Sequence, residues 1–519
     1  MARAAALALV LFALLTGDAR AADQLPVYVV EGQLMEFAGG AGGAVGLLVP
    51  GAGPETSREQ ALAALVRGEV RNSLRGGTSE DPPLISVDEL SGAPEPPYIL
   101  VSVPQGGKQS NDRRYQVAVV APGYEGILVS DSTRIPGLVS IADIAPTALG
   151  EDGALGSTAD AHAAATLRDL DKRIDEHNDS RVPAGLFAGL ILIALAILWP
   201  KAGLLGFGAA LLANLALALA EVSSFWPTVL VICLAAAAGG PLLALALRSD
   251  LAVGLFLAGI VAAYLVALGS DGSAVALSSF GPSQNSRFYG LSNFLETMLL
   301  VPALGGAVFL WRRLGWLAFT GVALLSFVTV AGNRFGADGG GAIVLAVAFP
   351  LLAILLARLR GRRLAVAVGT AVAVAVGLLV LDAVTGPESH VSRALDSGPS
   401  GLAADLRDRV ELSWDRIAQQ AGIAAVVAVC LPVLVLLVIR LLRSDAPLER
   451  RALPLAYAAA LATSLVVNDS PNDVLTAGLV GYVVVEAVML RDRCAALSPS
   501  PGSSPGSPSS LPAAAPPRS

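Results

Sequence analysis

The sequence predicts an α-helical polytopic membrane protein with about eleven transmembrane helices, preceded by a small extracytoplasmic α/β domain. Two observations predict the helical part. Apolar runs of about 20 residues recur after residue 182, and 15% of the 519 residues are charged, whereas a soluble globular chain has about 25%. Short strand-like runs between glycine and proline clusters predict the α/β part. This composition excludes an ordinary water-soluble enzyme, and we do not expect nucleic acid among the partners.

Residues 1–21 have the features of a secretory signal peptide. A cation, Arg3, precedes an apolar run over residues 4–15, and small residues surround the expected cleavage position after Ala21. The run is short for the roughly 30 Å thickness of the hydrocarbon core, although an uncleaved first anchor is the alternative. In both cases we expect the segment that follows to be exported.

Residues 22–155 are expected to form the α/β domain. A helix should begin after Ser57, because serine is a good N-cap and Gln60 stands three residues later, as in a capping box. The glycine-rich run at 39–43 lacks the spacing and the lysine of a phosphate-binding loop, so we interpret it as an ordinary loop. The strand-like runs are 27–30, 45–49, 98–103 and 115–121.

Residues 156–182 should contain a membrane-proximal helix. Leu167, Leu170 and Ile174 lie on one face at helical spacing, and charged residues occupy the other faces. His162 and His177 belong to this segment, and we expect both side chains to be exposed to solvent.

Apolar segments then recur throughout residues 183–490, which we expect to be the transmembrane domain. Each has close to the roughly 20 residues that a helix needs to cross the hydrocarbon core, and helices satisfy their backbone hydrogen bonds internally in lipid. The eleven segments are 183–199, 203–220, 225–247, 251–269, 294–311, 315–331, 341–357, 364–383, 419–439, 454–468 and 474–490.

The positive charges between these segments predict the orientation. Lysine and arginine accumulate in short cytoplasmic loops, and an exported amino-terminal domain gives 14 cations on the cytoplasmic face against 6 on the other. We therefore expect a cell-membrane protein with an extracytoplasmic α/β domain and a disordered cytoplasmic tail, the Pro- and Ser-rich residues 491–519. The larger set is Lys201, Arg248, Arg312, Arg313, Arg358, Arg360, Arg362, Arg363, Arg440, Arg443, Arg450, Arg451, Arg491 and Arg493, and the smaller set is Arg287, Arg334, Arg393, Arg407, Arg409 and Arg416.

Four unusual polar stretches fall on the expected outer side, at residues 286–293, 333–341, 388–393 and 468–473. The first leads into an apolar segment with Glu296 about one turn inside. An acid at that depth is costly unless it is paired or hydrated, so Glu296 is a candidate catalytic group. The alternative is a structural role, either as a pair with Arg287 or as an interfacial carboxylate. Arg287 and Asn293 are candidates for contacts with a substrate.

The second stretch is dense in glycine. Glycine lets a ligand approach backbone N–H groups, and a helix that begins here would point its positive end at the same place, which suits an anion. We expect Asn333 and Arg334 to bind a substrate and Asp338 to act as a catalytic acid or base. The alternative is a tight hairpin that needs glycine for packing, in which Arg334 and Asp338 form a pair.

The third and fourth stretches add further candidates. His390 is a candidate catalytic base and Arg393 a candidate substrate ligand, although a single histidine is more often a hydrogen-bonding surface residue. A segment at 402–417 follows, with apolar side chains on one face and arginines on the others, as in an amphipathic helix in the outer interface. Asp469 is a candidate substrate ligand, whereas a purely structural Asx turn is the alternative for the fourth stretch.

Residues 130–147 resemble a segment of the alkaline-phosphatase superfamily, through the run Pro136-Gly137-Leu138-Val139 and the run Asp143-Ile144-Ala145-Pro146-Thr147. Members of that superfamily hold two metals through Asp and His ligands, and residues 22–160 contain no histidine. The resemblance therefore implies a truncated, catalytically empty relative, and we expect no metal site in the domain.

The four polar stretches as a set resemble a group of uncharacterised multi-pass envelope proteins of bacteria. That group has RFYGxxN, GADxGG, SHxGR and NDS motifs, which correspond here to residues 287–293, 336–341, 389–393 and 468–470. The chain departs from the pattern at Ser392, where glycine is expected, and at Pro471. The resemblance implies the same organisation, but it implies no activity, cofactor or oligomeric state.

Three functions stay open at this point, and membrane lipid is a partner in each. The first is the handling of a lipid-linked phosphate or glycan at the outer leaflet, where arginine suits phosphate oxygens and carboxyl or imidazole groups suit proton transfer. The second is a transporter or flippase whose polar cluster is one end of a path. The third is a non-catalytic envelope assembly protein. The first would use Arg287, Arg334 and Arg393 on phosphate and Glu296, Asp338 or His390 as acid or base.

Overall fold

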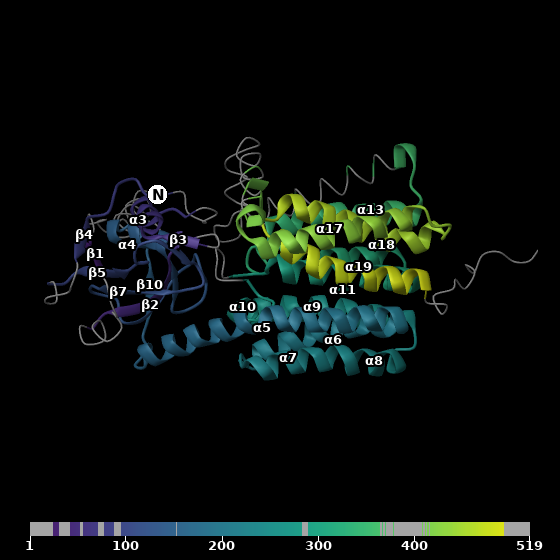
Figure 1. Cartoon of the computed structure of the whole chain (residues 1–519), viewed down its shortest axis with the longest axis horizontal. Helices are drawn as coiled ribbons and strands as arrows, with labels where there is room; N and C mark the ends of the chain where they lie inside the picture. The colour runs from purple at the N-terminus through teal and green to yellow at the C-terminus, as the bar shows by residue number, and fades with distance from the viewer. Residues whose placement is uncertain are drawn as a thin grey trace, which may run out of the picture.

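The computed structural model describes residues 24–30, 42–51, 55–70, 77–87, 95–151, 153–282, 289–363 and 416–491, with the single positions 366, 369, 377, 407, 410, 411, 413 and 414. The described chain has two parts, a small α/β sheet domain and a long bundle of helices (Figure 1). This arrangement confirms the predicted combination of a largely helical chain with a small N-terminal α/β region.

The sheet domain is built on an eight-stranded mixed sheet with the order β10-β8-β2-β7-β5-β1-β4, in which β9 also pairs with β2. β1 is parallel to β4 and β5, whereas β2 is antiparallel to β7 and parallel to β8. The four predicted strands are confirmed to within one residue at each end. The bounds are β1 Val27–Val30, β2 Ala44–Val49, β4 Leu84–Val87, β5 Tyr98–Ser102, β7 Tyr115–Val120, β8 Gly126–Val129, β9 Leu138–Ser140 and β10 Gly156–Thr158; a separate pair joins β3 Glu55–Ser57 to β6 Lys108–Ser110.

Helix α3 (Arg58–Arg67) follows the predicted capping box. The Ser57 hydroxyl accepts a hydrogen bond from the Gln60 N–H at 3.1 Å, and the Gln60 side chain accepts one from the Ser57 N–H at 3.0 Å. The helix ends at Gly68, whose φ of 62° lies in the left-handed region that glycine adopts easily. It packs against the short helices η1 (Ile141–Asp143) and α4 (Ile144–Leu149), which belong to the stretch 130–147.

In the described part of the chain, eight helices are long and apolar enough to cross a membrane by length and composition, which supports a multi-pass membrane protein. α12 is apolar but has 16 residues, and α18 has 20 residues of which the first turn is charged. The predicted segment 364–383 lies almost entirely outside the described residues, so the count of eleven stays a prediction. The helices are α5 Ala163–Leu198, α6 Pro200–Leu219, α7 Phe225–Leu234, η2 Ala235–Gly239, α8 Gly240–Ala246, α9 Asp250–Ser270, α10 Gly272–Ala276, α11 Asn293–Leu314, α12 Trp316–Ala331, α13 Gly339–Ala357, α17 Ala421–Leu442, α18 Leu448–Val467 and α19 Pro471–Arg491.

Helix α5 joins the two parts of the chain without a break. The predicted boundary at residue 182 is not a helix end, because α5 continues through Pro183. A proline removes one backbone hydrogen bond, which a long helix packed against neighbours tolerates. His177 is 5% exposed and lies 3.1 Å from the Ser279 hydroxyl, so the prediction that it is exposed is wrong. His162 is exposed, as predicted.

The sheet domain and the helices share an apolar core. β2 contributes Val45 and Leu47, α5 contributes Leu167 and Ile174, and the end of α10 adds Ala276. In Figure 1, α5 extends from the bundle alongside the sheet domain. The domain is therefore packed against the helices, and its position relative to them is set by side-chain contacts.

Helix α11 lies at the centre of the bundle. Of its apolar stretch, 89% is buried among other helices, whereas the value for α17 is 6%. The outward faces of the bundle carry large exposed apolar side chains, such as Trp226, Leu317 and Leu436, which suits contact with acyl chains. A polar group on α11 is therefore enclosed by protein.

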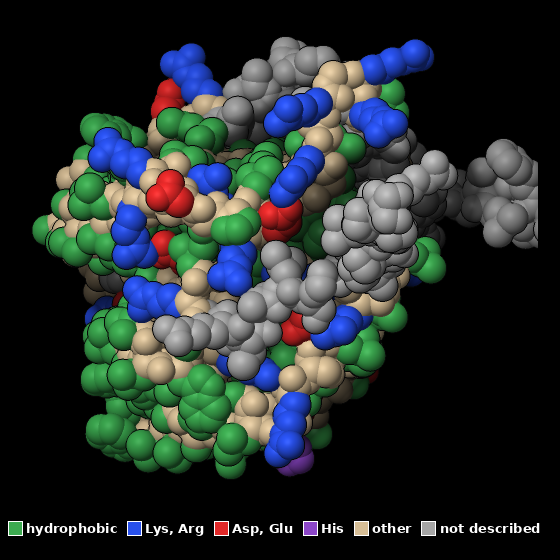
Figure 2. Space-filling view, turned by 90° about the vertical axis from the view of Figure 1, so that its right-hand side faces the viewer, with side chains coloured by type: hydrophobic (Ala, Val, Ile, Leu, Met, Phe, Trp, Pro, Cys, Tyr) green, Lys and Arg blue, Asp and Glu red, His purple; other side chains and the backbone are tan. Residues whose placement is uncertain are grey.

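The bundle has two ends, which we call the domain end, next to the sheet domain, and the far end. Figure 2 looks onto the far end, where Lys and Arg side chains gather. Lys201 at the start of α6, Arg312 and Arg313 at the end of α11, and Arg450 and Arg451 at the start of α18 all belong to this end. The described members of the larger set of cations thus lie away from the sheet domain, and this is the distribution that the predicted orientation implies. The side of the membrane on which each end lies stays a prediction.

Candidate functional site

Three of the four polar stretches fall at least partly within the described residues, and they meet at the domain end of the bundle. The first leads into α11, the second joins α12 to α13, and the fourth joins α18 to α19. Arg287, His390 and Arg393 lie outside the described residues. The described part of the site is therefore built from the domain ends of α11, α13, α18 and α19.

A buried group of polar side chains, which we call the Glu296 cluster, lies just inside the domain end. It consists of Glu296 on α11, Asp338 at the start of α13, and Ser464 and Asn468 at the end of α18, and each of these residues is at most 2% exposed. The Asn468 side-chain amide donates to Glu296 Oε2 at 3.0 Å and to Ser464 Oγ at 2.8 Å. Asn468 thus links the carboxyl group of α11 to α18.

The start of α11 is fixed by a cap. The Ser292 hydroxyl accepts a hydrogen bond from the Leu295 N–H at 3.0 Å and donates to the Phe280 carbonyl oxygen. Because α11 begins at Asn293, this cap places Glu296 in the first turn of the helix.

Gly340 and Gly341 allow the Glu296 cluster to approach α13. A Cβ atom on Gly341 would lie 3.1 Å from Glu296 Cγ, and one on Gly340 would lie 2.2 Å from Asn468 Oδ1. Neither glycine has a positive φ, so close packing requires them and backbone conformation does not. This favours the interpretation of the second stretch as a hairpin whose glycines serve packing.

Asp338 caps α13 and accepts hydrogen bonds from N–H groups of its first turn, which were the candidates for binding an anion. Its Oδ1 accepts a hydrogen bond from the Gly340 N–H at 3.1 Å, and its carbonyl oxygen accepts one from the Ala342 N–H at 2.9 Å. Among the ion pairs of the described residues, none joins Asp338 to Arg334, because Asp338 is 2% exposed and Arg334 is exposed to solvent. Arg334 therefore lies on the same turn as Asp338 but faces outward.

Backbone contacts join the first stretch to the second. The Leu291 N–H donates to the Gly336 carbonyl oxygen at 3.1 Å. Gly290 has a φ of 74°, and a Cβ atom there would lie 2.0 Å from the same carbonyl oxygen. Glycine is needed at 290 for both its backbone conformation and this close approach.

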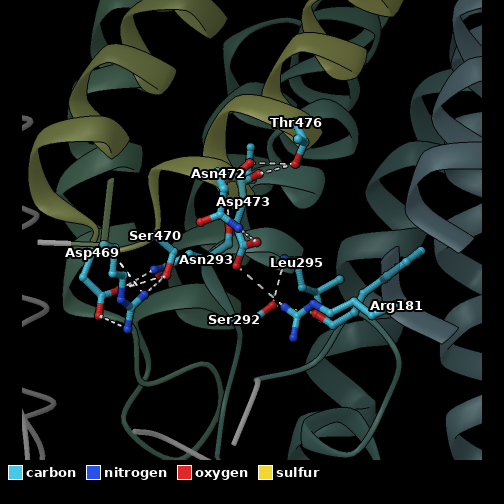
Figure 3. Close-up of polar contacts among 12 residues, drawn as sticks. Arg181, Ser292, Asn293, Leu295, Asp469, Ser470, Asn472, Asp473 and Thr476 are labelled. Atoms are coloured by element: carbon cyan, nitrogen blue, oxygen red, sulfur yellow. Dashed lines mark hydrogen bonds and ion pairs between the residues drawn. The ribbon is translucent and has the colours of Figure 1, made fainter. Parts of the chain in front are cut away.

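Ion pairs form a rim around the Glu296 cluster. Asp469 accepts a hydrogen bond from the Asn293 side-chain amide at 2.9 Å and pairs with Arg416 at 3.4 Å. Arg416 also donates to the Asp469 carbonyl oxygen at 3.0 Å and to Ser470 Oγ at 2.7 Å. Figure 3 shows Asn293, Asp469 and Ser470 close together. The charge of Asp469 is thus compensated by an arginine of the chain itself.

A second pair in the rim joins α5 to α19. The guanidinium of Arg181 lies 3.8 Å from the Asp473 carboxylate and 5.8 Å from the centre of the Phe294 ring. Asn472 donates to the same carboxylate at 2.9 Å. In Figure 3, Arg181 approaches Asp473 from the side away from Asp469. Two separate segments therefore supply the cations that hold the acidic turn between α18 and α19.

The sheet domain adds an arginine to this end of the bundle. Arg134, in the connection between β8 and β9, donates from its guanidinium to the Asn333 carbonyl oxygen at 2.7 Å. The same guanidinium lies 4.2 Å from the centre of the Tyr289 ring, a distance typical of a cation–π contact. The site therefore includes a residue from the domain as well as residues from the helices.

The structure brings together several residues that the sequence predicted for the site, and these are Asn293, Glu296, Asn333, Asp338 and Asp469. The prediction missed Arg134, Arg181 and Asn468 as site residues. Asn468 could have been found from its place directly before Asp469, whereas neither arginine has a local signal in the sequence.

The arrangement limits the chemistry of the site. The described residues contain no group of three or more His, Cys, Asp or Glu side chains that could hold a metal ion. Glu296 and Asp338 are buried carboxyl groups that both contact the first turn of α13. Carboxyl groups are the described acid or base groups of this end, and Arg334 is the described cation exposed on the same turn.

Fold and site together define a multi-pass membrane protein with a docked N-terminal sheet domain and a buried polar cluster at the domain end of its helices. No family model, curated protein or solved structure matches the chain. The resemblances to the alkaline-phosphatase superfamily and to bacterial envelope proteins therefore stay expectations.

Proposed function

We propose that this chain is a multi-pass protein of the bacterial cell membrane that handles a lipid-linked phosphate or glycan at the outer leaflet. The observation that carries the proposal is the Glu296 cluster, in which a carboxyl group on the central helix is buried near a second carboxyl group, Asp338. Acids buried inside a membrane protein are costly and occur mainly at sites of binding, proton transfer or transport. A local turn does not account for a cluster that three helices build.

The predicted orientation supports the outer leaflet as the place of action. The signal sequence and the distribution of cations both favour an extracytoplasmic sheet domain and a cytoplasmic C-terminal tail. The Glu296 cluster lies at the domain end, so the headgroups of the outer leaflet would lie at the level of the rim. Arg334 is exposed at this level.

Each part of the site has a role in this proposal. Arg334 binds phosphate oxygens, because a guanidinium matches them with two parallel charge-assisted hydrogen bonds. Glu296 or Asp338 acts as the acid or base that transfers a proton to or from the bound lipid-linked group. Arg287, His390 and Arg393, which lie outside the described residues, are expected to join them.

The test uses the full-length protein in nanodiscs, with a polyprenyl phosphate as the probe. Arg334→Ala should weaken binding by about 10- to 100-fold, because a hydrogen bond to a charged group contributes about 1.5–3 kcal/mol. Arg407→Ala is the matched control, since Arg407 is an exposed arginine of the same predicted face that pairs with Glu411, and it should bind like the wild type. Equal binding by the two variants, or no binding by the wild type, contradicts the proposal.

A transporter or flippase is the second candidate, because buried polar groups occur along α18 and α19 beyond the Glu296 cluster. Tyr457 and Tyr482 are fully buried, and within the described part of the chain their hydroxyl groups have no hydrogen-bond partner. Near the far end, Glu486 pairs with Arg440 at 2.7 Å. Polar side chains are therefore present at several depths of the bundle.

Liposomes distinguish the two candidates. A fluorescent polyprenyl phosphate that moves between leaflets faster with the protein than without it would favour transport, and Tyr457→Phe should then slow the movement. Binding of the probe without such movement favours action at the outer leaflet alone.

A further inference from the structure

Within the described residues, the sheet domain is fixed to the helices at three places. Its apolar core continues into α5 and α10. The Arg114 side chain, 3% exposed, pairs with both Asp171 and Asp175 of α5. The third place is Arg134, which differs from the other two because it contacts the segments of the candidate site.

A buried carboxylate holds the loop that carries Arg134. Asp143 is 0% exposed and accepts hydrogen bonds from the Ser130 hydroxyl at 2.6 Å, from the Ser140 N–H at 2.9 Å and from the Ser132 hydroxyl. Arg134 donates its own N–H to the Ser130 carbonyl oxygen at 2.9 Å. Residues 130–143 therefore build the loop that presents Arg134.

The backbone of Arg134 has an unusual conformation. Its φ of 55° lies in the left-handed region, which residues other than glycine rarely adopt and which persists where the surroundings fix it. Ile135, the next residue, is 3% exposed and belongs to the apolar core of the domain. The Arg134 side chain instead reaches Asn333, which is 199 residues further along the chain.

Each of the two groups that Arg134 contacts lies a few residues before a carboxyl group of the Glu296 cluster in the sequence. Asn333 is 1% exposed and opens the turn that leads to Asp338. Tyr289 is 4% exposed and precedes the cap that leads to Glu296. Arg134 thus touches both segments whose separation sets the distance between the two carboxyl groups.

We propose that Arg134 is a positioning residue for the membrane site. By holding the Asn333 carbonyl group and the Tyr289 ring with one guanidinium, it fixes Asp338 and Glu296 relative to each other. The sheet domain then acts as a cap that completes the site, and its removal would leave the two segments without this contact. The positioning role rests on the proposed function only for the identity of the ligand.

The first test measures hydrogen–deuterium exchange of the full-length protein in nanodiscs. Arg134→Ala should raise exchange in residues 289–292 and 332–338 by about tenfold or more, as expected when a charged donor is lost. Arg134→Lys keeps a cation over Tyr289 but loses the planar guanidinium. Exchange of both segments in this variant should therefore lie between the values of the wild type and of Arg134→Ala. Arg114→Ala removes another arginine of the domain–helix contact and should leave both segments unchanged.

Tyr289→Leu tests the same contact by changing the partner of Arg134. The substitution removes the ring under the guanidinium and should raise exchange in residues 332–338, so the test does not depend on the folding of one variant. Unchanged exchange in Arg134→Ala, or an equal rise in Arg114→Ala, would overturn the proposal, because Arg134 would then be one of several interchangeable docking contacts.

Binding of the polyprenyl phosphate probe separates this inference from the proposed function. If the wild type does not bind the probe but exchange rises in Arg134→Ala as described, the proposed ligand is wrong and the positioning role stands. If the wild type binds and Arg134→Ala shows both unchanged binding and unchanged exchange, the positioning role is wrong and the proposed function stands. The expected result is a rise in exchange together with a loss of binding of about tenfold.

Discussion

The two ends of the helix bundle each bury a glutamate, and they hold it in different ways. At the far end, Glu486 is 4% exposed and pairs with the guanidinium of Arg440 at 2.7 Å. At the domain end, Glu296 is 0% exposed and accepts a hydrogen bond from the amide of Asn468 at 3.0 Å. The domain end also buries a second carboxyl group, Asp338, which caps the same turn of α13 that Glu296 approaches. This pairing of two buried carboxyl groups makes the domain end the candidate for function.

The two glutamates also differ in how closely their surroundings are packed. A Cβ atom on Gly340 would clash with Asn468 of the Glu296 cluster, and one on Gly341 would be tight against Glu296 and would clash with Val330. The side chain of Arg440, in contrast, is 57% exposed and extends from the far end toward solvent or headgroups. The ion pair at the far end thus includes a largely exposed arginine, whereas the polar cluster at the domain end is enclosed by protein.

Replacement of each glutamate by glutamine should give the largest difference in turnover between the two ends. Glu296→Gln keeps the shape of the side chain but cannot transfer a proton, so turnover of a lipid-linked phosphate or glycan should fall by about 100- to 10,000-fold. Glu486→Gln should leave turnover unchanged, because its partner Arg440 is largely exposed. Mass spectrometry of the reaction mixture measures both. Similar losses of turnover in two well-folded variants would contradict a special role of Glu296 in proton transfer.

A methyl group added at the domain end should have the second largest effect. Gly341→Ala would place Cβ 2.4 Å from Val330 Cγ1 and 3.1 Å from Glu296 Cγ, and such overpacking lowers the free energy of unfolding by about 1–3 kcal/mol. Gly259→Ala in α9 is the control, because a Cβ atom there meets nothing within 4 Å. It should be neutral or stabilising, since alanine favours helix over glycine. Unfolding in detergent measures both, and equal losses would argue against close packing at Gly341.

Features that depend on neighbours in the sequence could be predicted from it. The capping box at Ser57 needs residues three apart, and apolar runs need about 20 consecutive residues, so both are visible in a local window. Polar stretches such as 333–341 and 468–473 could be recognised because they interrupt a long apolar sequence. These local signals were sufficient for four of the ten described strands, for helix α3 and for most of the apolar helices, and they located the polar stretches of the candidate site.

Contacts between distant segments could not be predicted in this way. Arg134 and Asn333 are 199 residues apart, and no local pattern pairs them. The apolar stripe of α5 indicated which face of that helix is buried, but not that the connection after α10 covers His177 on the same helix. Which of the predicted acids is enclosed and which is paired, as for Glu296 and Asp469, likewise depends on tertiary packing.

Substitutions in the rim should give the smallest difference, which is a difference in the free energy of unfolding. They test whether an arginine of the rim contributes more to stability than an exposed arginine of the same predicted face. Arg416 has a side chain that is 12% exposed and pairs with Asp469, whereas Arg407 is 80% exposed and pairs with Glu411. Arg416→Ala should lower the free energy of unfolding by about 1–3 kcal/mol, and Arg407→Ala by less than about 0.5 kcal/mol.

Unfolding of the two variants in the same detergent measures this difference. Equal values would mean that Arg416 is a surface cation like Arg407, free to leave Asp469 for a ligand. A larger loss for Arg416→Ala means that the rim supports the Glu296 cluster and that its arginine is committed to Asp469. Recognition of an anion would then fall to Arg334, which is exposed on the turn that leads to Asp338.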